Sequence, residues 1–173
     1  MPSLPTVPTV PAANSAGTSA WADNVANWIA FIANPPVFLG TVTTTFTVTT
    51  AGSGVTIPID TEEIDTAAGH STVTNNTRYT AQYPGRYLCI VSAVFPSTAG
   101  GRRGAWLILN GTTTYTDAGN TLAPATGVAR AQSSRMVFMN GTTDYVEGIA
   151  FQDSGGSIAG CTGTLQVIWI ASS

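Results

Sequence analysis

The residues that could carry out chemistry gather in a short stretch before the single histidine of the chain. Asp60, Glu62, Glu63 and Asp65 form the densest group of ionisable side chains, and His70 follows them. Two carboxylates can perform glycoside hydrolysis, and several can bind Ca²⁺. Strand alternation would put Glu63 and Asp65 on one side and Asp60 and Glu62 on the other. Because the spacing matches no calcium loop, we interpret the cluster as a solvated turn or as intersubunit salt links. Candidate partners for such links are Arg78, Arg86, Arg102 and Arg103.

Nucleophilic catalysis would need His70 beside a serine or cysteine. His70 lies in a loop of small residues, and no Gly-x-Ser-x-Gly turn, phosphate loop or dinucleotide fingerprint accompanies it. We therefore interpret His70 as structural or solvated. Cys89 and Cys161 lie in apolar strand-like contexts, which favours two buried thiols over one disulfide. Two cysteines and one histidine cannot form a standard zinc site. The sequence thus predicts no catalytic residue, no cofactor and no metal ligand.

The charge of the chain is low and unclustered. Charged residues make up 9% of the chain against 43% hydrophobic residues, all six basic residues are arginine, and the net charge is −3. Without a basic run, we expect no nucleic-acid binding and no docking on anionic membranes. No apolar stretch approaches the length of a membrane span, and residues 1–17 do not resemble a secretory signal. The low charge has two interpretations: sister subunits cover much of the surface, or Thr, Ser, Asn and Gly replace charge there.

The first 36 residues predict an extended arm followed by one helix. Proline recurs every third position from Pro2 to Pro11, which favours polyproline II. Thr18 or Ser19 can cap a helix of about 15 residues, which Asn34-Pro35-Pro36 stops. We interpret residues 1–36 as an anchoring unit. The apolar face of the helix packs either on the β domain of its own chain or on sister subunits or a host particle. That face consists of Trp21, Val25, Trp28, Ile29 and Ile32, widened by Phe31.

Residues 37–173 predict an all-β domain, because Thr and Val dominate and Gly and Asn punctuate short segments. Asn110-Gly111 and Asn140-Gly141 each separate two strand-like segments, which predicts two hairpins. Arg102-Arg103 falls in a Gly-rich loop that we interpret as solvated, with an acidic neighbour or an anionic glycan as the alternative contact. The predicted strands are 37–50, 55–60, 77–82, 86–95, 104–110, 113–116, 121–124, 128–139, 145–152 and 162–171.

Several of these strands are apolar on both faces. In 86–95, for example, Tyr87, Cys89 and Val91 alternate with Leu88 and Ile90. One face can fill a sandwich interior, but no helical layer covers the other, and monomers rarely expose patches of several hundred Å². Burial around a symmetry axis solves this, and a large barrel or sandwich closed by its own loops is the alternative. The predicted oligomer interface residues are Leu88, Ile90, Val94, Trp106, Ile108, Phe138, Ile168 and Ile170.

Short motifs over about the last hundred residues resemble the tumour-necrosis-factor and complement globular-head superfamily. Pro84-Gly85-Arg86-Tyr87 matches that family's "pGxY" strand, and Leu109-Asn110-Gly111 matches its "kNG" turn. Asp144-Tyr145-Val146 matches its "GDxV" strand, with Thr143 in place of the glycine, and Gly163-Thr164-Leu165 matches its closing strand. The resemblance implies an antiparallel jelly-roll sandwich. It also implies a homotrimer in which apolar inner sheets pack on a threefold axis.

The N-terminal unit resembles a different group of proteins. Trp21–Val25 and Phe31–Pro36 are similar to the opening of minor tail and related structural proteins of phages that infect Actinobacteria, and a chain without lysine suits a GC-rich genome. This resemblance implies a non-enzymatic virion protein, assembled in the host cytoplasm and displayed on the capsid or the tail beside other virion proteins. The alternatives are a receptor-binding module that grips a host surface glycan and, third, a glycan hydrolase that uses the acidic cluster.

Overall fold

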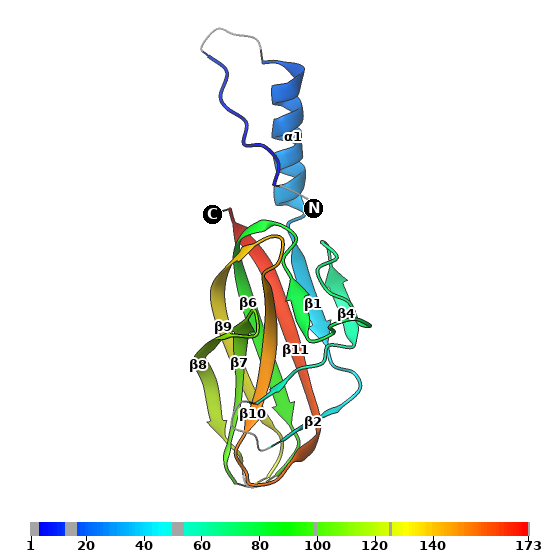
Figure 1. Ribbon diagram of the computed structural model, residues 1–173, viewed down its shortest axis with the longest axis vertical. Coiled ribbons are helices and arrows are strands. Elements are labelled where there is room, and N and C mark those ends of the chain that lie inside the picture. Colours follow the sequence, from blue (N-terminus) through cyan, green and yellow to red (C-terminus); the bar gives the residue numbers. More distant parts are fainter. Residues whose placement is uncertain (1–3, 13–16, 50–53, 99, 125, 173) are drawn as a thin grey trace.

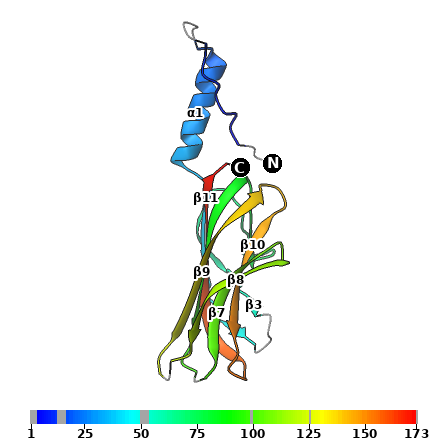
Figure 2. The same cartoon turned by 90° about the vertical axis from the view of Figure 1, so that its left-hand side faces the viewer.

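The computed structural model describes residues 4–12, 17–49, 54–98, 100–124 and 126–172. Over these residues the chain forms two antiparallel sheets packed face to face, with one helix projecting from one end (Figures 1 and 2). This confirms the predicted all-β jelly-roll sandwich with an extended arm and one short helix. No helix in the described part of the chain is both long enough and apolar enough to cross a bilayer.

The first sheet, here called the β9 sheet, contains the long strands that the sequence marks as apolar on both faces. β2 (Phe46–Val48) pairs with the first part of β11, beside the main run of strands. The main run is, in order, β4 (Thr61–Asp65), β1 (Val37–Thr41), β11 (Ile158–Ala171), β6 (Pro84–Phe95) and β9 (Ala129–Asn140).

The second sheet, here called the β10 sheet, lies against the first, and Figure 2 shows the two sheets edge-on. β5 (Arg78–Thr80) pairs with one end of β10, beside the main run. The main run is β3 (Val55–Thr56), β10 (Tyr145–Gln152), β7 (Arg102–Leu109) and β8 (Thr113–Leu122).

The core fills the space between the sheets and takes alternate residues from each strand. In β6, Tyr87, Cys89, Val91, Ala93 and Phe95 are all fully buried. This is the face that strand periodicity assigns to the sandwich interior. Side chains from both sheets complete the cluster, among them Phe38, Tyr79, Leu107, Met139, Leu165 and Val167.

The helix α1 (Ser19–Ala33) has the predicted position and length. The Thr18 side chain accepts a hydrogen bond from the Trp21 amide at 3.2 Å, which caps the first turn. The cap at Asn34 precedes two prolines that cannot continue the helix. The described part of the arm, residues 4–12, runs back along α1, and Leu4 packs against the edge of the core (Figure 1).

Several strands differ from the sequence-based expectation: 55–60 keeps only Val55–Thr56 as β3, and β7 begins at Arg102, inside the expected loop. Segment 37–50 forms β1 and β2 separated by a turn, because the Asp60 carboxylate accepts the amides of Thr43 and Thr44 and draws them out of the ladder. Segments 113–116 and 121–124 belong to a single strand, β8. The acidic stretch that includes Glu62 is an edge strand, β4, and not a turn. Charged side chains on an edge strand discourage pairing with other chains.

Only one of the two predicted hairpins forms. Asn110 and Gly111 both have positive φ, +54° and +65°, and they connect the paired strands β7 and β8. At the second Asn-Gly, the Asn140 side chain accepts the amides of Thr142, Thr143 and Asp144. Because these bonds fold the loop locally, the chain crosses from the β9 sheet to the β10 sheet, and no hairpin results.

Candidate oligomer interface

The side chain of His70 is completely buried and makes only structural contacts. Its Nδ1 lies 2.8 Å from Glu62 Oε1, its Nε2 lies 3.2 Å from the Asn76 carbonyl oxygen, and its ring stacks on Phe38 with centroids 4.9 Å apart. No serine or cysteine side chain is among these partners. Of the two expected environments, structural or solvated, His70 therefore has the buried, structural one.

The acidic cluster serves the loops beside it. Two Asp65 oxygens accept the amides of Ala67, Gly69 and His70. Desolvation opposes ionisation of Asp60, but the hydrogen bonds that its carboxylate accepts from Thr43 and Thr44 outweigh it. They hold the pKa of Asp60 well below its ordinary range. Over the residues that the structure describes, no group of three or more His, Cys, Asp or Glu side chains is arranged to hold a metal ion.

The two adjacent arginines have different environments. Arg102 is exposed, and its Nε lies 2.8 Å from Asp153 Oδ2. The hydrogen bond from the Arg102 amide, followed by the one from its guanidinium, lowers the pKa of Asp153. Arg103 is fully buried, and its guanidinium donates to the carbonyl oxygens of Thr98, Gly100 and Arg102. The sequence did not indicate this burial, because two arginines in a Gly-rich segment predict a loop in which both side chains are solvated.

Both cysteines are free and buried. Burial raises the pKa of the Cys89 thiol to about 12, so the thiolate is not formed at neutral pH. The preference for two buried thiols over a disulfide is confirmed, and neither sulfur is placed to act as a nucleophile.

The outer face of the β9 sheet carries large apolar side chains that the described chain does not cover. Strand register places apolar residues side by side across it: Leu88 pairs with Ile168 on one side and with Met136 on the other, and Ile168 pairs with Val37. Residues that pair across strands lie on the same face of a sheet. Next to this row, on the side of α1, Phe138 pairs with Arg86. On the other side of the row, Leu39 pairs with Gln166 and Ile64 and continues the apolar surface.

Side chains on this face are exposed although they are large and apolar. Exposed fractions are 55% for Met136, 51% for Phe138 and 46% for Ile170, whereas the next residues along the strands, Val137 and Trp169, lie in the core. The strands are therefore apolar on both faces, as the sequence predicts, and within the chain only one face is covered.

The apolar surface occupies one half of the face, the half next to α1. In the other half Ser92 and Thr164 are hydrogen-bonded at 2.7 Å, and Arg130, Gln132 and Ser134 are exposed along β9. We call the apolar half the sheet patch and define it by Val37, Leu39, Ile64, Leu88, Ile90, Met136, Phe138, Ile168 and Ile170.

The eight predicted interface residues fall on two different surfaces. Leu88, Ile90, Val94, Phe138 and Ile168 lie on the outer face of the β9 sheet, with Val94 in its polar half, and Ile170 is 46% exposed at a register shift next to them. Trp106 and Ile108 are on β7 of the β10 sheet, where Trp106 pairs with Ile149 and its ring lies 5.1 Å from that of Phe151. They therefore do not share a surface with the other six.

Sequence reasoning missed the contribution of β1 and β4 to the sheet patch. Val37, Leu39 and Ile64 join it because β1 lies between β11 and β4. The alternation of Val37, Leu39 and Thr41 with the buried Phe38 was the available signal. Nothing in the sequence shows which strands are neighbours.

The helix α1 touches the β domain through only part of its surface. The Phe31 ring packs edge-on against Tyr83 and Trp169, with centroids 5.1 and 4.8 Å away, and Trp28 contacts Phe31. No residue of the helix is buried, and Ile29 and Ile32 are 62% and 64% exposed. The chain's own β domain therefore leaves much of the apolar stripe of α1, defined as Trp21, Val25, Trp28, Ile29 and Ile32, uncovered.

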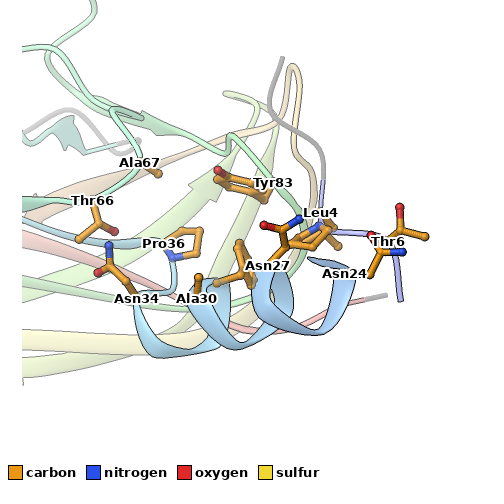
Figure 3. A pocket seen from close by; sticks show the side chains of 12 residues that line it. Leu4, Thr6, Asn24, Asn27, Ala30, Asn34, Pro36, Thr66, Ala67 and Tyr83 are labelled. Carbon is orange, nitrogen blue, oxygen red and sulfur yellow. The ribbon is translucent and has the colours of Figure 1, made fainter. Parts of the chain in front are cut away.

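A pocket of about 530 Å³ separates the arm from α1. Figure 3 shows Asn24, Asn27 and Asn34 on its helix side, with Leu4 and Tyr83 across from them. The lining is largely amide and small apolar groups, without a charged side chain. The pocket fixes which side of α1 faces the arm.

Comparison with known proteins identifies the architecture. The globular domain of zebrafish complement 1qA protein matches 80% of this chain and 98% of its own, at 13% identity and a TM-score of 0.62. The chain has the jelly-roll fold of this domain. Murine APRIL matches 78% of this chain and 98% of its own, at 11% identity and a TM-score of 0.57. PRD1 vertex protein P5 matches 78% of this chain and 73% of its own, at 14% identity and a TM-score of 0.57. No family model and no curated protein matches the sequence.

Proposed function

We propose that the protein is a non-enzymatic structural module of a phage virion and that it works as a homotrimer. The observation that carries this proposal is the sheet patch, a set of large apolar side chains that the chain exposes on the outer face of a central sheet. Isolated subunits rarely expose such a surface, and closed symmetry lets identical subunits bury it against one another. The resemblance to the complement globular head supports three copies around one axis.

The two ends of the domain suit display on a particle. Helix α1 and the end of β11 lie at one end, and the loop 153–157 lies at the other (Figure 1). If the N-terminal unit attaches the module to the particle, the loop at the opposite end points away from the particle surface. The similarity of the N-terminal unit to phage tail proteins, and of the fold to PRD1 vertex protein, supports a place on the capsid or tail of a virion assembled in the host cytoplasm.

The trimer can be tested with one charge placed in the sheet patch. We expect Phe138→Asp to shift the protein from trimer to monomer in size-exclusion chromatography with light scattering, because an unpaired carboxylate in a buried interface costs about 3 kcal/mol or more per subunit. Val128→Asp is the matched control, since Val128 is 53% exposed but lies outside the sheet patch. A wild-type protein that is monomeric at micromolar concentration would contradict the proposal.

A second candidate function is binding of a host surface glycan by the end remote from residues 1–36. There the exposed Arg102 guanidinium pairs with Asp153 and lies 5.9 Å from the centre of the Phe151 ring, so charged, polar and aromatic groups are adjacent. Such a combination can contact a sugar ring and an acidic substituent together. A glycan array probed with the intact protein distinguishes adhesion from a purely architectural role.

A further inference from the structure

We propose that the α1 helices of three copies pack together through their apolar stripes, forming a three-helix stalk on the axis of the trimer. This inference rests on the proposed trimer and adds a second interface, which the β domain does not contain. It also assigns the partner of the stripe: a second and a third copy of the same helix.

The spacing within the stripe is that of a coiled-coil seam. Trp21, Val25, Trp28 and Ile32 follow one another in steps of four, three and four residues, and this is the alternation that keeps one line of side chains facing a neighbouring helix. Ile29 widens the line. Asp23 is the single charged residue between Ser19 and Ala33, so neighbouring helices would bring little like charge together.

The arm covers a different side of the helix. Asn24, Asn27, Ala30, Phe31 and Asn34 line the pocket that faces residues 4–6 (Figure 3). At 3.6 residues per turn, Asn27 and Val25 point about 160° apart. On the seam side, Ile29 and Ile32 are 62% and 64% exposed, whereas Trp21, Val25 and Trp28 are partly buried within the chain.

The base of α1 lies next to one end of the sheet patch. Figure 2 shows α1 rising above the β9 sheet, with the described arm on the side of the β10 sheet. Through Phe31 and Trp169, the base of the helix joins the end of β11, and Ile170, the next residue of that strand, belongs to the sheet patch. The symmetry axis that buries the sheet patch would consequently pass beside the seam.

The length of α1 explains why the stalk would depend on the domain trimer. Its 15 residues span about two heptads, and helices of this length are marginal in water without tertiary contacts. When the sheet patches assemble, they hold three helix bases together and raise the effective concentration of the seams. Three helices joined in this way bury side chains that one helix cannot bury.

The test uses engineered cysteines in the full chain. With a mild oxidant and dilute protein, we expect Val25→Cys to form disulfide-linked dimers faster than Asn27→Cys by about tenfold or more, because only the seam positions of neighbouring helices meet. Both positions lie on the surface of the same helix, two residues apart, and the natural cysteines Cys89 and Cys161 are buried. The readout is the crosslinked fraction on non-reducing gels over time.

Each outcome separates the stalk from the trimer. A protein that is trimeric by light scattering, but in which Val25→Cys crosslinks no faster than Asn27→Cys, overturns the stalk and leaves the proposed function standing. A monomeric protein overturns the proposed function and the stalk with it. Faster crosslinking of Val25→Cys that disappears when Phe138→Asp is added supports both interfaces.

Discussion

Asp60 shows how a residue that resembles a catalytic or metal-binding group can instead organise the backbone. Its two carboxylate oxygens accept hydrogen bonds from the amides of Thr43 and Thr44, at 2.8 and 2.6 Å, and from the hydroxyl groups of Thr43 and Thr61. These bonds hold the turn between β1 and β2 against the start of β4. All of them favour the ionised carboxylate, and therefore they tie the local fold to pH.

We expect Asp60→Asn to lower the free energy of unfolding by about 1–2 kcal/mol at pH 7, because one of its two oxygens becomes an amide that cannot accept. The folded-state pKa of Asp60 is depressed, so its stabilisation is present above the unfolded pKa and is lost as the pH falls through the folded value. The difference between wild type and variant should therefore narrow below about pH 4.

Urea denaturation at fixed protein concentration, at pH 7 and at pH 3, measures this difference. Glu63→Gln serves as the control because Glu63 is an exposed carboxylate on the neighbouring strand β4. Equal stability of Asp60→Asn and Glu63→Gln at pH 7 would show that the Asp60 bonds contribute little.

At the scale of elements, β8 and β9 close one side of the sandwich although they belong to different sheets. Gly119 in β8 approaches β9 so closely that a Cβ atom there would lie 2.1 Å from the Gln132 carbonyl oxygen. Real Cβ atoms do not approach backbone oxygens to this distance, so only glycine permits the approach. The sequence shows a glycine inside a strand and does not show what lies beside it.

Gly119→Ala should consequently push β8 away from β9 and destabilise the domain by about 1–3 kcal/mol, the usual cost of overpacking. Thermal unfolding followed by circular dichroism measures the effect. Gly156→Ala is the matched control, because a Cβ at Gly156 meets no atom within 4 Å and its φ is not positive. Comparable melting temperatures for the two variants would contradict the close approach.

At the scale of the whole molecule, the N-terminal unit and the β domain meet over a small area. The contacts between them centre on Phe31, Tyr83, Trp169 and Leu4, and the core between the sheets contains no residue of α1. We therefore interpret residues 1–36 and 37–173 as separate units that divide attachment and display between them.

Deleting residues 1–36 should leave a folded β domain that still trimerises through the sheet patch and no longer joins the particle. Light scattering measures the trimer, and virions assembled with the truncated protein report attachment. We expect the truncated trimer to dissociate at a higher protein concentration than the full chain, because the stalk contacts are missing. Normal incorporation of the truncated protein into particles would contradict the anchoring role.

The sequence by itself determined the class of fold and the excess of apolar surface. Strand periodicity identifies both apolar faces of β6 and β11 from residues such as Leu88 and Cys89, and the cap at Thr18 together with the prolines after Asn34 fixes α1. These features are local, so spacing along the chain is enough to reveal them.

Only the tertiary structure decided which apolar faces lie together. It places Trp106 and Ile108 on the other sheet, adds Val37, Leu39 and Ile64 to the sheet patch, and buries Arg103. It also replaces one predicted hairpin with a crossing between sheets at Asn140. Strand order and register arise from pairings between residues that are distant in the sequence. The spacing within one strand shows which residues share a face, but it does not show which strands lie beside it.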